Sequence, residues 1–185
     1  SEGSECVRPC CVMPPEEKPK PPPPKTLSRL AETALVETID GPVEIVKLVG
    51  KVMPVLTRFR DGALGFRMMT AIRQLEDGEL FELQNEDEQR VCLGGDHVLV
   101  RADGSEVRVR DIKPGDALEP GWTYVAGYTP PDAAEYAPGV RGRPWDRAVV
   151  VRSVQRIGQG PQFGFSVNET KRYFLTFGAM SRAQV

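Results

Sequence analysis

An all-β fold class is predicted by two alternating runs around an Asp-Gly turn and by turn residues that recur along the whole chain. The runs His97–Arg101 and Glu106–Arg110 alternate polar and apolar side chains on either side of Asp103-Gly104-Ser105. Alternation flanking an Asp-Gly pair is the strongest short-range signal for a β-hairpin. The chain also has 18 glycines and 17 prolines in 185 residues, which favours short strands joined by many turns.

A tight turn is predicted directly after this hairpin. Within Asp111–Asp116, Pro114 presets φ for the second position of a turn, and Gly115 supplies the positive φ that the third position of a type II turn requires.

Further strands are expected along the folded body, which begins near Thr26. Period-two or β-rich runs bounded by turn residues are found at Ala34–Asp40, Pro42–Val49, Met53–Phe59, Phe66–Glu76, Glu79–Gln84, Gln89–Leu93, Trp122–Val125, Arg147–Ile157, Phe163–Val167 and Tyr173–Phe177. We expect Gly158–Pro161 to turn the chain, and the last two runs to pair with each other. The run Ala148–Val151 is apolar enough to be buried on both faces.

Two segments stand apart from this body of strands. Residues 1–27 form a leader rich in cysteine and proline, expected to be an extended spacer because proline fixes φ and removes backbone donors. A disordered linker and a tail that orders on a partner remain equally open. Residues 28–185 form the β domain, and residues 129–146, rich in Pro, Gly and Arg, form a long surface loop within it.

Composition excludes several classes of function. A net charge of −2 and a pI near 5.6 leave no basic footprint for nucleic acid, so we expect no nucleic-acid partner. No apolar run approaches the ~20 residues of a membrane span. The chain begins without methionine or a signal-like segment, so we expect a processed product or a shortened piece.

No cofactor and no metal site are expected. Cys6, Cys10 and Cys11 do not have a zinc spacing and lack a nearby histidine, so disulfides or surface thiols are expected instead. Cys92 is predicted to be a buried, inert thiol, because it lies in an apolar strand-like run. Asp96 is predicted to cap the turn before His97, and Asp111 and Asp116 to hold turn backbone.

Four segments carry a more specific pattern. These are Val36–Ile45, Gly95–Val100, Val109–Asp116, and the closing pair of Phe165–Glu169 with Tyr173–Gly178. In this order and at this spacing they resemble the Hint fold shared by inteins and the autoprocessing domain of hedgehog proteins. The resemblance covers residues 28–182 and implies a compact horseshoe of antiparallel strands, preceded here by the proline-rich tail.

The resemblance also implies a chemistry, from which this chain departs. In that family a Cys or Ser at the start of the first strand attacks the preceding carbonyl, and a histidine protonates the departing nitrogen. Counted back from Asp40-Gly41, the nucleophile position is Arg29, or Ser28 if one extra residue is allowed. His97 is retained, but glycine stands at the position of the family's threonine. The closing Ser181-Arg182-Ala183 lacks the His-Asn pair of inteins.

Two functions therefore remain. The motif losses favour a Hint-like domain that has lost autoprocessing, is not an enzyme, and serves as a structural or protein-binding module in a larger assembly. Its protein contacts would be made by the proline-rich leader and the 129–146 loop. The alternative is a self-cleaving domain with Ser28 as nucleophile and His97 as general acid. In the first case His97 is a fold histidine, and Ser28 a capping or turn residue.

The aromatic residues around the long loop have two interpretations. They are Trp122, Tyr124, Tyr128, Tyr136 and Trp145. Aromatic side chains dominate the hot spots of protein interfaces, so these could form a recognition surface. They could equally pack at the base of the loop.

Overall fold

The computed structural model describes residues 26–120, 122–123, 143–144 and 148–184. Residues 1–25 of the predicted leader, and all but two residues of the predicted 129–146 loop, lie outside the described residues, as do Tyr124, Tyr128, Tyr136 and Trp145. The described part of the chain is built of β-strands with two short 3₁₀ turns, which confirms the predicted all-β class.

The described residues form fourteen strands, numbered in chain order. They are β1 (Leu30–Ala31), β2 (Leu35–Thr38), β3 (Gly41–Glu44), β4 (Met53–Arg58), β5 (Leu64–Asn85), β6 (Arg90–Gly94), β7 (Val98–Val100), β8 (Glu106–Arg108), β9 (Ala117–Leu118), β10 (Trp122–Thr123), β11 (Arg143–Pro144), β12 (Val149–Val167), β13 (Arg172–Phe174) and β14 (Met180–Arg182). The 3₁₀ turns η1 and η2 span Ile45–Leu48 and Val109–Asp111.

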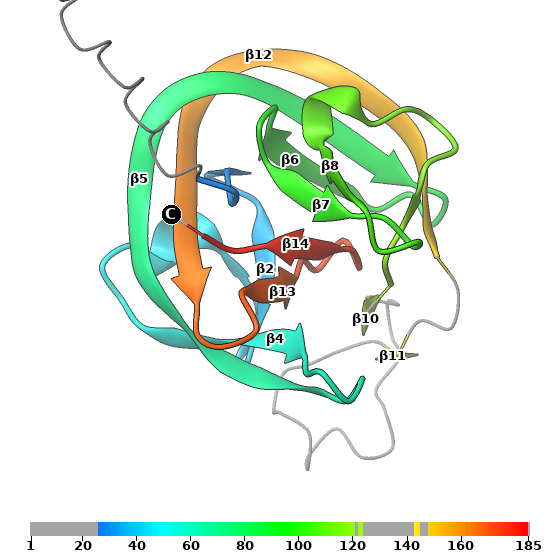
Figure 1. The fold of residues 1–185 in the computed structure, drawn as a ribbon. Helices are drawn as coiled ribbons and strands as arrows, with labels where there is room; N and C mark the ends of the chain where they lie inside the picture. The colour runs from blue at the N-terminus through cyan, green and yellow to red at the C-terminus, as the bar shows by residue number, and fades with distance from the viewer. Residues whose placement is uncertain (1–25, 121, 124–142, 145–147, 185) are drawn as a thin grey trace, which may run out of the picture.

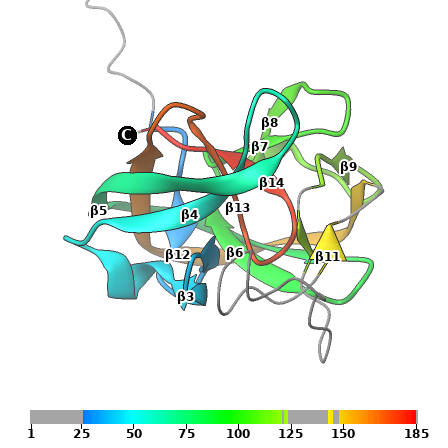
Figure 2. The same cartoon turned by 90° about the horizontal axis from the view of Figure 1, so that it is seen from below.

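Two very long strands give the molecule its horseshoe shape. β5 has 22 residues and β12 has 19, and they pair antiparallel while curving together around the smaller strands (Figure 1). Both belong to an eight-stranded sheet of order β3-β2-β4-β5-β6-β1-β12-β9. Seen after a quarter turn, β4 runs beside the first half of β5 along one side of the molecule (Figure 2).

The predicted turn at Gly158–Pro161 is wrong, and the predicted strands Phe66–Glu76 and Glu79–Gln84 are parts of one strand. β12 continues through Gly158 and Pro161, and β5 continues through Gly78, which pairs with Gly160. The register instead shifts at four places along β12, including between Arg156 and Gly158, where Gly158 has φ +129°. Such β-bulges bend a strand without ending it, and they accommodate a proline that cannot donate to the ladder.

A four-stranded sheet of order β13-β14-β7-β8 lies inside the curve (Figure 1). Its β7–β8 pair is the predicted hairpin, with Leu99 opposite Val107 and Gly104 at φ +89° in the turn. The predicted type II turn is also present, with the Asp116 N–H bonded to the Lys113 carbonyl at 3.0 Å and Gly115 at φ +96°.

The predicted closing pair is wrong in its partners. β13 pairs with β14, placing Tyr173 opposite Ser181, rather than with Phe163–Val167. Those residues form the end of β12 and pair with β5. The error arises because a long strand and a hairpin arm have the same alternating pattern.

Two smaller expectations also need correction. The expected strand Pro42–Val49 ends at Glu44 and continues as the 3₁₀ turn η1. In the run Ala148–Val151, Val149 and Val151 are buried while Val150 is half-buried, so one face of this run is only partly covered.

The core lies between the two sheets. The largest fully buried side chains are Tyr173, Phe165, Phe174, Leu30, Ile45, Leu56, Met69, Leu83, Leu93, Leu99 and Leu118. The rings of Phe165 and Tyr173 are in contact, with centroids 4.5 Å apart and planes inclined by 55°. This contact fixes the position of the Tyr173 hydroxyl deep in the domain.

Candidate functional site

The candidate site is a buried network of polar side chains centred on His97. His97 lies in the turn between β6 and β7, where its N–H bonds to the Gly94 carbonyl at 3.0 Å and its carbonyl accepts from the Val109 N–H at 2.9 Å. Ser28 and Arg29 come just before β1. The side chains of Ser28, His97, Tyr173 and Ser181 are all 0% exposed.

The hydrogen bonds of the His97 ring determine its tautomer. The Arg29 N–H donates to His97 Nδ1 over 2.8 Å, so Nδ1 carries no proton. In a neutral imidazole the proton is then on Nε2, which lies 2.9 Å from Ser181 Oγ and donates to it.

Burial keeps this imidazole neutral. It lowers the pKa of His97 to about 3. The ring is therefore a hydrogen-bonding group of the folded protein with its charge suppressed at neutral pH.

Tyr173 links Ser28 to the same network. Ser28 Oγ lies 2.8 Å from the Tyr173 hydroxyl. Burial raises the pKa of Tyr173, and hydrogen bonds from Ser28 and Ser181 partly oppose the rise. The network thus runs from Arg29 through His97, Ser181 and Tyr173 to Ser28, and its side chains find their partners inside the protein.

The chain enters and leaves the domain beside this network. The Leu27 N–H donates to the Gln184 carbonyl at 2.8 Å, and the Leu27 carbonyl accepts from the Val98 N–H at 2.9 Å. The two ends of the described chain are therefore joined by a hydrogen bond.

The two predicted site residues lie in this network, with no hydrogen bond between their side chains. Ser28 bonds to Tyr173, and the amide that faces the imidazole belongs to Arg29. Gly94, at the position of the family's threonine, donates its N–H to the Arg29 carbonyl at 2.8 Å.

Two other residue predictions are corrected. Asp96 makes ion pairs with Arg108 and Arg110, at 3.1 and 2.9 Å, and does not cap the turn. Cys92 is half-buried rather than buried, and burial and the charge of Glu82 raise the pKa of its thiol. The predicted backbone contact of Asp116 is present, from the Lys113 N–H at 3.0 Å.

Sequence reasoning missed Tyr173 and Ser181. Ser181 was visible only as part of a closing motif that lacks His-Asn, and Tyr173 as one apolar position in an alternating run. The β13–β14 pairing places these residues opposite each other, and the pairing of β14 with β7 brings them to His97.

The described residues contain no group of three or more His, Cys, Asp or Glu side chains arranged to hold a metal ion. In the same part of the chain, no helix has the length and apolar character needed to cross a membrane.

Comparison with known proteins places the fold. No model of a protein family matches the sequence, and no curated protein matches it. Solved structures do match. The DnaB intein from Synechocystis superposes with a TM-score of 0.63 at 11% identity, covering 85% of this chain and 99% of that chain. The DnaX mini intein from Spirulina platensis gives 0.61 at 12% identity, covering 84% and 99%.

A third similar structure was named for its likeness to inteins. The bacterial intein-like domain from Clostridium thermocellum gives a TM-score of 0.62 at 15% identity, covering 85% of this chain and 99% of that chain. Identities this low bear on the fold alone. The horseshoe of β5 and β12, enclosing a small sheet and a lone buried histidine, is thus the Hint fold of inteins.

Proposed function

We propose that this chain is a Hint-fold domain that does not process itself and serves as a structural or protein-binding module within a larger assembly. The observation that carries the proposal is the hydrogen bond from the Arg29 N–H to His97 Nδ1. An acyl shift needs a nucleophilic side chain on the residue whose amide faces the general acid. That residue is Arg29, and a guanidinium cannot form an ester.

The state of His97 supports the same proposal. Because burial lowers its pKa to about 3, the imidazole is almost entirely neutral at pH 7. A general acid works best with a pKa near the working pH, because it must hold the proton that it gives away. His97 accepts a hydrogen bond at the atom facing the peptide, and it has no proton to donate there.

The alternative is self-cleavage at Leu27–Ser28. Ser28 Oγ would attack the Leu27 carbonyl carbon to form an ester, the C–N bond would break, and the Ser28 nitrogen would take up a proton. One contact favours this alternative. The Val98 N–H already donates to the Leu27 carbonyl oxygen at 2.9 Å, the kind of donor that stabilises a developing oxyanion.

Intact mass measurement separates the two. The full chain is incubated with dithiothreitol or with hydroxylamine, which cleave thioesters and esters respectively. We expect a single species of unchanged mass. A hydroxylamine-dependent break between Leu27 and Ser28 that disappears in Ser28→Ala would refute our proposal and establish the alternative.

A cysteine variant at position 29 tests the same proposal. Arg29→Cys places a thiol on the residue whose amide faces His97. Because the neutral imidazole has no proton to give at that atom, we expect this variant to stay intact as well. A dithiothreitol-dependent break between Ser28 and residue 29 would show that the nucleophile is the only missing part of the machinery. Arg29→Ala, which removes the same guanidinium without adding a nucleophile, is the matched control and should stay intact.

The binding role is assigned to the leader and to the 129–146 loop. A proline-rich segment is a ready-made ligand for aromatic grooves, because its extended form loses little entropy on binding. We expect a variant lacking residues 1–25 to lose a native partner that the full chain retains in affinity capture. Retention of that partner would refute the role of the leader.

A further inference from the structure

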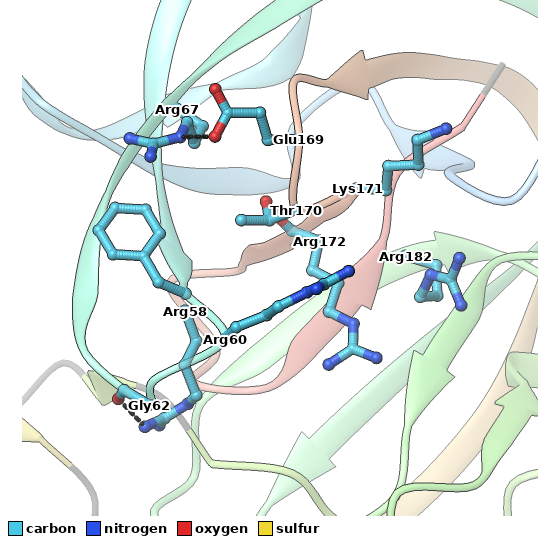
Figure 3. A pocket seen from close by; sticks show the side chains of 10 residues that line it. Arg58, Arg60, Gly62, Arg67, Glu169, Thr170, Lys171, Arg172 and Arg182 are labelled. Carbon is cyan, nitrogen blue, oxygen red and sulfur yellow. Dashed lines mark hydrogen bonds and ion pairs between the residues drawn. The ribbon is translucent and has the colours of Figure 1, made fainter.

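A strongly basic cavity of about 790 Å³ lies away from the His97 network. Its walls are the β4–β5 turn and the β12–β13 turn, with β13 and β14 completing it (Figure 3). One carboxylate, Glu169, lines it together with six cations. The cations are Arg58, Arg60, Arg67, Lys171, Arg172 and Arg182.

The pairing of β13 and β14 explains how two of these arginines meet. Arg172 is directly opposite Arg182, just as Tyr173 is opposite Ser181. Side chains alternate between the faces of a sheet, so the Tyr173 pair enters the His97 network and the Arg172 pair faces the cavity. Like charges directly opposite each other destabilise a sheet, and a bound anion would offset that cost.

Half of the cations already have fixed partners. Arg58 donates to the carbonyls of Gly62 and Pro120 at 2.9 and 2.8 Å. Arg67 bonds Glu169 at 3.1 Å, and Arg182 bonds Glu106. These contacts hold the cavity walls in position without a ligand.

The other three cations are available. Arg60, Lys171 and Arg172 are exposed, and within the described part of the chain their side chains have no hydrogen bond or ion pair. The turn that presents Lys171 is held in an unusual conformation. Lys171 has φ +54°, and Glu169 in the same turn has φ +63°. Both values lie in the left-handed region, which residues other than glycine rarely adopt.

The arrangement of charges distinguishes between possible anions. One bidentate arginine satisfies the charge and both oxygens of a carboxylate. A phosphoryl group carries up to two charges and three acceptor oxygens, so it needs more than one cation. The two free guanidinium groups of Arg60 and Arg172 and the Lys171 ammonium carry three positive charges, more than a single phosphoryl group neutralises. The cavity volume is in the range of small-molecule sites.

The same lining argues against a nucleobase. Its one aromatic residue is Phe59, and the Arg67 guanidinium covers that ring at 4.3 Å from the centroid. Single-stranded nucleic acids rely on open aromatic faces for base stacking. We propose that this cavity binds a small polyanion with two or more phosphoryl groups on a non-aromatic carrier.

Isothermal titration of the full chain with tripolyphosphate at low salt tests the proposal. We expect one site per chain, with Kd rising at least about tenfold in Arg172→Gln and in Arg60→Gln, because each variant loses charge-assisted hydrogen bonds. Both side chains are exposed, and thermal melting confirms that each variant is folded. Arg90→Gln is the matched control, since Arg90 is exposed on β6 and pairs with Glu82. It should stay within about twofold of the parent.

Titrations with further ligands distinguish a soluble phosphate from a lipid headgroup, and phosphoryl groups from other polyanions. Binding of tripolyphosphate and of inositol hexakisphosphate supports a soluble ligand. Binding to phosphoinositide vesicles that the two Gln variants weaken equally supports the same site on a lipid headgroup. Three outcomes would overturn the proposal: no heat with any phosphoryl ligand, equal affinity in parent and both variants, or tighter binding of hexaglutamate or oligothymidylate.

Discussion

His97 illustrates how burial and hydrogen bonding determine the charge state of a side chain. Its ring is fully buried, with Nδ1 accepting from the Arg29 amide and Nε2–H donating to Ser181. Both ring nitrogens are satisfied only in the neutral form, because protonated Nδ1 would confront the Arg29 N–H. At the scale of the residue, the histidine therefore stabilises the fold in its uncharged state.

This argument predicts a pH dependence of stability that belongs to His97. The unfolded chain protonates this histidine near pH 6.5, whereas the folded protein does so near pH 3. Between these values the unfolded state binds more protons, so the free energy of unfolding falls as pH falls. The slope is at most about 1.4 kcal/mol per pH unit.

His97→Gln isolates that contribution. Urea unfolding from pH 7.5 to pH 4 should show the stability advantage of the parent over the variant shrinking as pH falls. His97 is the only histidine in the chain, so no other imidazole contributes. A constant difference across this range would show that the folded protein protonates His97 normally.

At the scale of the element, the decisive feature is that β5 and β12 bend without ending. Residues with turn chemistry lie inside both strands, Gly78 in one and Gly158 in the other. Paired along their length, the strands use bulges for the curvature that encloses the small sheet. The bulge at Gly158 has a φ of +129°, which a residue with a side chain does not readily adopt.

Gly158→Ala tests this role of the bulge. No atom lies within 4 Å of the added Cβ, so any cost comes from the backbone conformation rather than from a clash. We expect a loss of about 1–3 kcal/mol in the free energy of unfolding, measured with urea.

Gln159→Ala is the neighbouring control, exposed and one residue further along the same strand. It should change stability by less than about 0.5 kcal/mol. Equal effects of the two substitutions would show that the bulge does not need glycine.

At the scale of the whole molecule, the small sheet separates two chemical environments. Tyr173 and Ser181 contribute to a neutral, buried network, while Arg172 and Arg182 contribute to a basic cavity. The chain enters and leaves next to the first of these, at the hydrogen bond between Leu27 and Gln184. The described core extends from Leu30 to Ala183.

That extent of the core predicts that the body folds without the leader. A variant lacking residues 1–25 should keep the circular dichroism spectrum of the full chain and melt within about 2 °C of it, since no residue of the described core is removed. A large drop in melting temperature would show that the leader is part of the folded unit, contrary to the predicted boundary at residue 28.

Local sequence determined those features that depend on the backbone preferences of a few adjacent residues. Asp103-Gly104 specifies the β7–β8 hairpin and Pro114-Gly115 the turn after it, because the required φ values are intrinsic to glycine and proline. The alternating runs were sufficient to predict the fold class. Four segments in the right order were sufficient for the resemblance to the Hint fold.

Tertiary structure alone decided what joins these pieces. Whether Gly158–Pro161 turns or bends the chain depends on the partner strand β5, which supplies the hydrogen bonds that keep β12 continuous. The partner of His97 is an amide 68 residues away, and no local pattern selects Arg29 over Ser28. The basic cavity likewise assembles cations from separate turns and strands. These features rest on contacts between distant parts of the chain, so their energies are absent from any short stretch of sequence.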